Sequence, residues 1–484
     1  MKVTLVGAGP GGIGLLTLKG LEVLQAADVV LYDRFVSDDI LAVIPESAEK
    51  INVGKSAGHH SVPQDTINNL LLEKAKQGKN VVRLKGGDPF IFARGGEELE
   101  FLAKNDIPFE VVPGITSAIA AAIYAGIPIT HRDCASSLHI ITVHAKNNEP
   151  LNIDFGALVK LNGTLVFLMG VAAVNTICEN CIAAGMDKDM PAAIVENAAT
   201  SSQRKFLGTV SNLPEIAHTN KVKSPAVIII GKVCEFSERY DWFGKKPLRN
   251  KRIVVARIKS TKLAKSLEEL GCDVIKFPCF KIVPLISSEK KLKDYSWLVF
   301  TSDIGVNIFF DYLIERGIDI RELGGIKIAC VGIETEKEVK RRGIKADYVP
   351  TEYNGAALAR GLIGLVKNGS KVLIARAKNG DQDLTRILAD AGIAFDDVPI
   401  YEKIVDTSST NTITLNDFDF AAFTSPSAVE GFAKLATNID FHKIKVVCIG
   451  EKTAAAARAY GMEVYVSAEA TIKSMVEKIK ELSA

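Results

Sequence analysis

The stretch Lys2–Gly12, K-V-T-L-V-G-A-G-P-G-G, joins a short apolar run to a glycine-rich turn. It matches the G-x-G-x-x-G pattern, in which a strand ends in a tight turn and a phosphate binds at the N-terminus of the next helix. Asp28 and Asp33 follow at about the distance of a carboxylate that binds a ribose. Pro10 argues against a dinucleotide, because it removes a backbone N–H from the turn that would hold the pyrophosphate. By itself the motif is weak evidence for any ligand.

Two further glycine and proline turns follow strand-like runs. Leu84–Glu98 reads L-K-G-G-D-P-F-I-F-A-R-G-G-E-E, and Val111–Ser117 reads V-V-P-G-I-T-S. Three such turns at strand ends predict one cleft. Asp88 follows Gly87, where backbone can approach a ligand closely and a carboxylate can accept from an amine or hydroxyl, although an Asx turn would also place an aspartate there.

Short apolar runs alternate with helical stretches along most of the chain, which indicates an α/β protein with much parallel sheet. In the first half the expected strands are Val3–Val6, Val29–Tyr32, Val81–Leu84, Leu165–Leu168 and Ala226–Ile230. The length of 484 residues predicts two to four domains. The pattern breaks across Glu235–Asn250, so the main boundary is expected near residue 248. The basic cluster of Lys245, Lys246 and Arg249 is interpreted as a solvated linker rather than a nucleic-acid site, because no motif or interleaved aromatic residues accompany it.

Composition narrows the class of protein. Hydrophobic residues make up 47% and charged residues 24%, and 59 Lys plus Arg against 57 Asp plus Glu leave a net charge of +2. A well-packed soluble enzyme is expected, with no nucleic-acid or membrane partner. Val3–Leu18 and Val111–Thr130 imitate a signal or membrane segment, but glycines and prolines interrupt both. The second stretch is expected to be a buried helix between two turns.

The eight cysteines are scattered and no export signal is recognised, so free thiols in a cytoplasmic protein are expected. Cys178 and Cys181 form a C-x-x-C pair, but no second pair or histidines at zinc-finger spacing accompany it. The pair is expected to fill core, and no metal site is expected.

The second half contains a weak internal repeat. Trp297–Ser302, W-L-V-F-T-S, precedes a segment that ends in G-I-E-T at Thr335, and Phe420–Ser425, F-A-A-F-T-S, precedes one that ends in G-E-K-T at Thr453. Two similar lobes are therefore expected. Each copy places hydroxyls and backbone N–H groups at helix N-termini, which favour anions, although plain N-caps would use the same residues.

Several ordered motifs resemble the uroporphyrinogen-III C-methyltransferases of the tetrapyrrole methylase family, over residues 1 to about 244. They are G-A-G-P-G-G-I-G-L-L-T, Y-D-R at Tyr32–Arg34, V-G-K at Val53–Lys55, R-L-K-G-G-D-P-F-I-F and V-V-P-G-I-T-S. The resemblance implies a two-lobed α/β fold and a homodimer through this half. It further implies that S-adenosylmethionine methylates C2 and C7 of uroporphyrinogen III to give precorrin-2, for siroheme or cobalamin.

The resemblance also implies roles for single residues. Asp33 falls on the family's proton acceptor and Lys55 on its proton donor, which suits an electron-rich pyrrole carbon that attacks a sulfonium methyl. Without the resemblance, the two would be interpreted as a solvated pair. Gly12 and Ala198 depart from the family pattern, which usually has Asp and often Gly there. The family's cofactor contacts fall on Pro10, Gly86, Gly87, Asp88, Ile91, Thr116, Ser117, Met169 and Ala198.

The second half resembles uroporphyrinogen-III synthases from about residue 250 to 484, through V-F-T-S, V-G-I-E-T, V-L-I-A-R, P-I-Y-E-K, F-T-S-P-S-A and I-G-E-K-T. This implies a two-lobed fold that closes hydroxymethylbilane with inversion of ring D and loss of water, without cofactor. Its product is the methyltransferase's substrate, so the fusion joins consecutive steps. The expected domains are a methyltransferase at 1–244, a linker at 245–250 and a synthase at 251–484, with lobes at 251–283 plus 405–484 and at 284–400.

Within the synthase resemblance, Tyr401 matches a tyrosine proposed to help the departing hydroxyl, and a packing aromatic between lobes is an equally good interpretation. The repeated hydroxyl turns suit a polyanionic substrate. The expected carboxylate partners are Arg257, Ser302, Thr335, Arg376, Ser425, Ser427 and Thr453. Two alternatives stay open: an NAD-dependent oxidoreductase that rests on the first glycine motif, and a second half that binds a tetrapyrrole without catalysis.

Overall fold

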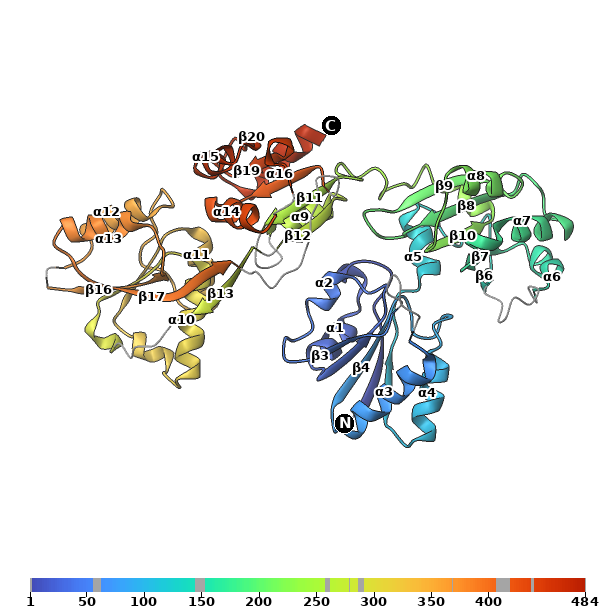
Figure 1. The fold of residues 1–484 in the computed structure, drawn as a ribbon, viewed down its shortest axis with the longest axis horizontal. Helices are drawn as coiled ribbons and strands as arrows, with labels where there is room; N and C mark the ends of the chain where they lie inside the picture. Colours follow the sequence, from blue (N-terminus) through green and yellow to red (C-terminus); the bar gives the residue numbers. More distant parts are fainter. Residues whose placement is uncertain are drawn as a thin grey trace. The chain divides into compact units, whose positions relative to one another are not determined.

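The computed structural model describes residues 2–54, 62–143, 153–256, 262–277, 279–285, 291–367, 369–405, 418–436 and 439–483. Within these ranges the chain forms four five-stranded sheets with helices packed on them (Figure 1). The contacts divide it into two compact units, one of residues 1–253, 265–274 and 479–484 and one of residues 254–264 and 275–478. The α/β fold class is confirmed.

The first sheet is wholly parallel, in the order β3-β2-β4-β1-β5. Its strands are β1 (Lys2–Gly7), β2 (Val29–Tyr32), β3 (Glu49–Asn52), β4 (Asn80–Lys85) and β5 (Phe109–Val112). Helices α1 (Leu18–Gln25) and α2 (Asp38–Leu41) cover one face, and α3 (Gln64–Lys76) and α4 (Gly95–Lys104) cover the other (Figure 1). Because all five strands run the same way, their carboxyl ends lie at one edge.

The second sheet is mixed, in the order β6-β7-β10-β8-β9. It is built from β6 (Leu138–Thr142), β7 (Thr164–Leu168), β8 (Pro191–Glu196), β9 (Arg204–Thr209) and β10 (Ala226–Ile230), with α6 (Phe155–Lys160), α7 (Val174–Ala183) and α8 (Leu213–Thr219). Strand β10 runs antiparallel to both β7 and β8, which the apolar runs did not predict. Cys178 and Cys181 of α7 lie in its core, as expected.

Helix α5 (Ser117–Tyr124) connects the two sheets. It begins one turn after β5 of the first sheet, and its alanines Ala118, Ala121 and Ala122 pack on Val166 and Ile229 of the second. The buried helix between two turns is therefore confirmed. No helix in the described part of the chain is both long and apolar enough to span a membrane.

The third sheet, β12-β11-β18-β19-β20, takes strands from the beginning and the end of the second half. Its elements are β11 (Arg252–Ala256), α9 (Lys262–Glu269), β12 (Asp273–Phe277), β18 (Phe420–Phe423), α14 (Pro426–Leu435), β19 (Lys445–Cys448), α15 (Glu451–Ala459), β20 (Glu463–Val466) and α16 (Ile472–Ser483).

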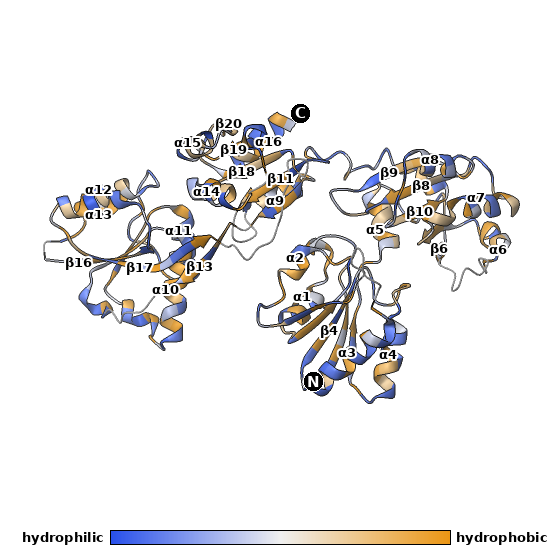
Figure 2. Cartoon of the chain, viewed as in Figure 1, coloured by the Kyte–Doolittle hydropathy of each residue, from blue (hydrophilic) through white to orange (hydrophobic). Residues whose placement is uncertain are grey.

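The fourth sheet, β13-β17-β16-β14-β15, is formed by the residues between them. Its elements are β13 (Phe280–Pro284), β14 (Trp297–Phe300), α10 (Asp303–Glu315), β15 (Lys327–Cys330), α11 (Ile333–Arg341), α12 (Gly355–Ile363), β16 (Lys371–Ala377), α13 (Gln382–Asp390) and β17 (Ala394–Val405). β13 pairs antiparallel with β17, so residues 280–283 belong to this sheet rather than to the lobe in which they were expected. In Figure 2 apolar colours dominate the strands, while the helices alternate apolar and hydrophilic stretches.

The internal repeat is visible in these two sheets. The succession β14-α10-β15-α11 recurs as β18-α14-β19-α15. Ser302 and Ser425 are the N-caps of α10 and α14 with nearly the same backbone angles, φ −163° and ψ 154° against φ −162° and ψ 154°. Gly332 and Gly450 likewise precede α11 and α15 in extended backbone.

The segment after residue 244 is partly packed, which corrects the expectation of a solvated linker for Leu248 and Arg249, whereas Lys245 is exposed as expected. Leu248 is fully buried, and its N–H donates to the carbonyl oxygen of Leu270 at 3.0 Å. Arg249 donates to the carbonyl oxygens of Ser201 and Gln203. Leu248 and Arg249 contact residues that are distant in the sequence, and the charges of the segment alone do not predict these contacts.

Candidate functional site

The three glycine turns meet at the carboxyl edge of the first sheet. Gly9 N donates to Gly87 O at 3.1 Å, and Gly87 N donates to Gly9 O at 3.0 Å, so the first two turns form a backbone bridge. A Cβ at Gly114 of the third turn would lie 2.2 Å from Gly87 O, and one at Gly7 would lie 2.5 Å from Gly114 Cα. Side chains cannot fit between these backbones, so each of these positions needs glycine.

Asp88 ties the second turn to the third. Its Oδ1 accepts from Phe90 N at 2.8 Å, which is the Asx turn considered above, and its Oδ2 accepts from Gly114 N at 3.0 Å. The Asp88 carboxylate therefore holds the second and third turns together. Gly86 precedes it on the same turn and packs against Phe35, whose Cβ would lie 2.9 Å from an added Cβ.

Helix α5 starts from the third turn. Thr116 is its N-cap, with Oγ1 accepting from Ala118 N at 3.4 Å, and Ser117 is its first residue. The first backbone N–H groups of a helix lack intrahelical partners, so this end can bind a carboxylate or hydroxyl. Ile91 of the second turn is partly exposed.

The expected cofactor residues of the second sheet follow its parallel strands β7 and β8. Met169 comes directly after β7, with φ 57° and a half-exposed side chain. Ala198 lies in the loop after β8, and the carbonyl oxygen of its neighbour Ala199 would lie 2.7 Å from a Cβ at Gly11. That contact brings a loop of the second sheet onto the first glycine turn, which contains Pro10.

Asp33 follows β2 at the same edge and is held by a buried ionic network. Its Oδ1 accepts from Arg83 Nη2 at 2.7 Å. Arg83 Nε donates to Glu98 Oε1 at 3.1 Å, and Lys85 Nζ donates to both oxygens of Glu98 at 3.0 Å. The side chains of Arg83 and Lys85 are 3% exposed, Glu98 is fully buried, and Asp33 is 27% exposed. Asp33 is thus the end of the network that meets solvent.

Sequence reasoning missed Arg83, Lys85 and Glu98. Two cations two residues apart in a central strand point to the same face, and burial there requires an acidic partner. The pattern V-V-R-L-K in β4 with the glutamates of α4 carried that signal. Burial, followed by the charge of Arg83, lowers the pKa of Lys85, while Glu98 opposes the shift. Lys55, the expected proton donor, lies outside the described residues.

In the fourth sheet Tyr401 and Ser302 are hydrogen-bonded. The Tyr401 side chain, on β17, is 2% exposed, and its hydroxyl lies 2.9 Å from Ser302 Oγ. Ser302 Oγ also accepts from Gly305 N at 3.0 Å in its role as N-cap. Burial raises the pKa of Tyr401, and the hydrogen bond with Ser302 opposes that shift. The Tyr401 hydroxyl is therefore connected to the N-terminus of α10 through the Ser302 hydroxyl.

The other expected carboxylate partners differ in their surroundings. Arg376 on β16 is buried and donates to both oxygens of Asp397, at 2.7 and 2.6 Å, so its charge is already paired. Thr335 and Thr453 are buried within the first turns of α11 and α15. Ser425 Oγ accepts from Ala428 N at 3.3 Å and lies 3.1 Å from Ser427 Oγ. Arg257 lies outside the described residues.

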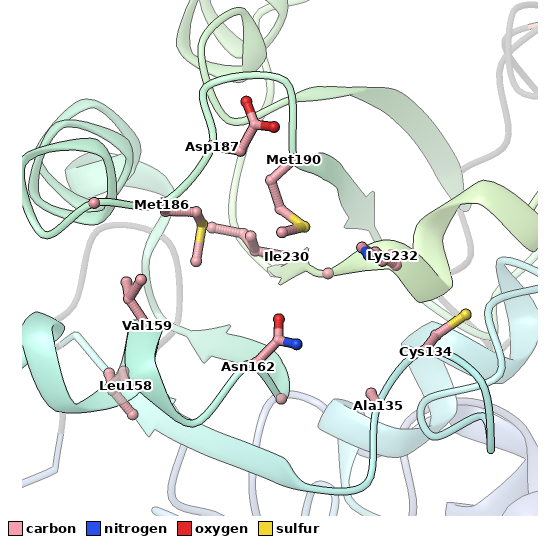
Figure 3. A pocket seen from close by; sticks show the side chains of 13 residues that line it. Cys134, Ala135, Leu158, Val159, Asn162, Met186, Asp187, Met190, Ile230 and Lys232 are labelled. Atoms are coloured by element: carbon pink, nitrogen blue, oxygen red, sulfur yellow. The ribbon is translucent and has the colours of Figure 1, made fainter.

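A cavity of about 180 Å³ lies elsewhere, beside the second sheet. Met186, Met190 and Asn162 point into it, with Lys232 and Cys134 at its border (Figure 3). Its described lining contains none of the residues expected to bind cofactor or tetrapyrrole.

Known proteins resemble both halves. The family Tetrapyrrole (Corrin/Porphyrin) Methylases matches residues 2–214, and the family Uroporphyrinogen-III synthase HemD matches residues 261–477. The porphyrin biosynthesis protein HemD of Ruminiclostridium josui is 47% identical over 492 residues, which cover 99% of this chain and 98% of that protein. The siroheme synthase of Enterobacter sp. (strain 638) is 52% identical over 242 residues, 50% of this chain and 52% of that protein.

Two solved structures of a uroporphyrin-III C-methyltransferase from Thermus thermophilus, one native and one complexed with S-adenyl homocysteine, are each 38% identical to this chain. Each covers 49% of this chain and 99% of its own, with a TM-score of 0.42. The similarity to the Ruminiclostridium protein, in contrast, spans nearly the whole of both chains. The chain therefore belongs to the HemD family of porphyrin biosynthesis proteins, with a tetrapyrrole methylase in its first half and a uroporphyrinogen-III synthase in its second.

Proposed function

We propose that this chain catalyses two consecutive steps. Residues 251–484 close hydroxymethylbilane to uroporphyrinogen III with inversion of ring D, and residues 1–244 methylate that product at C2 and C7 with S-adenosylmethionine to give precorrin-2. The observation that carries the proposal is the carboxyl edge of the first sheet, where three backbone turns and Asp33 come together. The match of each half to a family of tetrapyrrole enzymes supports it.

The backbone of the three turns fits S-adenosylmethionine as a ligand. Glycines let the chain approach a nucleoside without side chains in between, and the N-terminus of α5 offers N–H groups to its polar atoms. When bound, the cofactor supplies an electrophilic methyl group. The residues of this chain then orient the two reactants, which is expected to give most of the acceleration.

Asp33 is the proposed proton acceptor of the methyl transfer. Its partner Arg83 fixes one carboxylate oxygen, and the remaining oxygen is available for a pyrrole N–H or for the proton that leaves the methylated ring. Lys55 is proposed as the proton donor by resemblance. Placing the carboxylate on a buried arginine suits a group that must keep one orientation through two methylations.

In the second half we propose that the paired turns at α10, α11, α14 and α15 bind substrate carboxylates through backbone N–H groups and hydroxyls. Tyr401 acts on the substrate through Ser302, because its own hydroxyl is buried. Arg376 contributes to this site indirectly, since its guanidinium is hydrogen-bonded to Asp397.

The test is to incubate the purified chain with hydroxymethylbilane, with and without S-adenosylmethionine, and to identify the oxidised porphyrins by chromatography and mass spectrometry. The type III isomer without cofactor, and two added methyl groups with it, are the expected products. Only type I isomer from the bilane, with methylation of supplied uroporphyrinogen III, would leave the second half a binding module. The homodimer and the cytoplasmic location stay predictions, the first open to sedimentation analysis.

A further inference from the structure

The loop Asn197–Gln203, which follows β8 and is called the β8 loop below, holds an unfavourable backbone shape. Asn197 and Ala199 have left-handed backbone, with φ 48° and 62°. Asparagine adopts this region readily, whereas alanine adopts it only where its surroundings hold it there. The Gln203 side chain supplies part of that hold: its Oε1 accepts from Ala199 N at 2.8 Å, and its Nε2 donates to Tyr124 O at 3.0 Å.

Arg249 holds the far end of the β8 loop. Its guanidinium donates to the carbonyl oxygens of Ser201 and Gln203, and its Cζ lies over the ring of Phe243, 4.9 Å from the centroid. A planar guanidinium can serve two neighbouring oxygens at once, which an ammonium group cannot do in the same geometry. Burial lowers the pKa of Arg249, and the nearby Asp241 opposes the shift.

The segment that carries Arg249 is itself fastened on both sides. Two residues of the methylase half contact this segment. Ile123 O accepts from Trp242 Nε1 at 3.0 Å, and Lys205 Nζ lies 2.9 Å from an oxygen of Asp241. Leu248 N donates to the carbonyl oxygen of Leu270, just after α9 of the synthase half, at 3.0 Å. The segment that contains Arg249 is therefore hydrogen-bonded to residues before it and after it in the sequence.

We propose that Arg249 is a positioning residue for S-adenosylmethionine. By closing the β8 loop it presses Ala199 against Gly11 of the first glycine turn and places Ala198 in the cofactor site. This inference rests on the proposed function, since Ala198 is assigned to the cofactor there. Its consequence is that the methylase half depends for its cofactor affinity on residues beyond 244, at the junction with the synthase.

The experiment measures the Kd of S-adenosylmethionine by isothermal titration calorimetry on the full chain. Arg249→Ala is expected to raise Kd roughly tenfold, the factor carried by about one charge-assisted hydrogen bond. Arg249→Lys is expected to lie between, because it keeps the charge but loses the two-oxygen contact. Lys245→Ala is the matched control: Lys245 is an exposed cation of the same segment that donates to Glu238 O at 3.2 Å, and its Kd should equal that of the wild type.

Two further readouts separate positioning from general damage. The rate of uroporphyrinogen-III formation by the same chains should be unchanged, and methyl transfer should show a raised KM for the cofactor with a nearly unchanged kcat. A wild-type Kd in both Arg249 variants, or a loss of kcat alone, overturns the inference. If Arg249→Ala does not fold, Arg249→Lys with a wild-type Kd still overturns it. A wild-type chain that does not bind the cofactor at all refutes the proposed function instead.

Discussion

Glu98→Gln should destabilise the first half strongly, because Glu98 is the buried anion that compensates Arg83 and Lys85. The substitution keeps the size and shape of the side chain, so the change is one of charge. Asp33 still pairs with Arg83 at 2.7 Å, so Lys85 is the cation that loses its directly contacting carboxylate. Breaking a buried ion pair costs about 3–5 kcal/mol. For a unit of this size that corresponds to a fall in Tm of roughly 6–20 °C.

The assay is differential scanning calorimetry of the full chain, with Glu97→Gln as the matched control. Glu97 is the neighbouring residue on α4, is exposed, and pairs with the exposed Arg94, so its loss should cost about 0–1 kcal/mol. The transition of the second compact unit, residues 254–264 and 275–478, provides an internal reference, since it should not move. A change in Tm for Glu98→Gln as small as that of the control would show that the network does not depend on this charge.

The pH dependence of the same variant gives a second check. Burial already lowers the pKa of Lys85, and removal of the Glu98 charge lowers it further. A lysine whose pKa is lower in the folded than in the unfolded state binds fewer protons when folded, so stability rises with pH between the two values. The difference in Tm between variant and wild type should therefore shrink as the pH approaches the ordinary lysine pKa. A difference that grows with pH would contradict this account.

Three further outcomes are expected. Gly114→Ala should abolish binding of S-adenosylmethionine in calorimetric titrations, because its Cβ would meet a backbone oxygen of the second turn at 2.2 Å; Gly96→Ala, whose Cβ would meet no atom within 4 Å, should bind normally. Tyr401→Phe should cost about 1 kcal/mol of stability and should slow ring closure less than Ser302→Ala, and the reverse order of rates would refute action through the serine. A thiol reagent should modify Cys134 first in the native chain, since the other cysteines are buried, and a second equally fast thiol would contradict the packing.

The strands and turns of the first sheet could be predicted from sequence because their signals are local. The expected Val29–Tyr32 and Ala226–Ile230 are the observed β2 and β10. A parallel sheet gathers its strand ends at one edge, so three glycine turns after three strands had to meet there. Gly7 and Gly114 of those turns are required by backbone contacts, and a sequence shows such glycines directly.

Other features depend on contacts between distant residues. An apolar run does not state its direction, so the antiparallel course of β10 was not predicted. The basic cluster looked solvated because its charges are visible in sequence, whereas the carbonyl oxygens that receive Arg249 are not. Arg83 and Glu98 are 15 residues apart and meet only once β4 and α4 are packed.

The divided third sheet sets an order of events during synthesis on the ribosome. Strand β11 ends at Ala256, and its sheet neighbour β18 begins at Phe420, about 160 residues later. At roughly 5–20 residues per second, β11 leaves the ribosome on the order of 10–30 s before the strand that completes its pairing. During that interval the methylase half and the fourth sheet can fold, while β11 presents an open edge that could pair with another nascent chain. Slow translation of the last hundred residues would therefore lower the yield of folded synthase half before that of the methylase half.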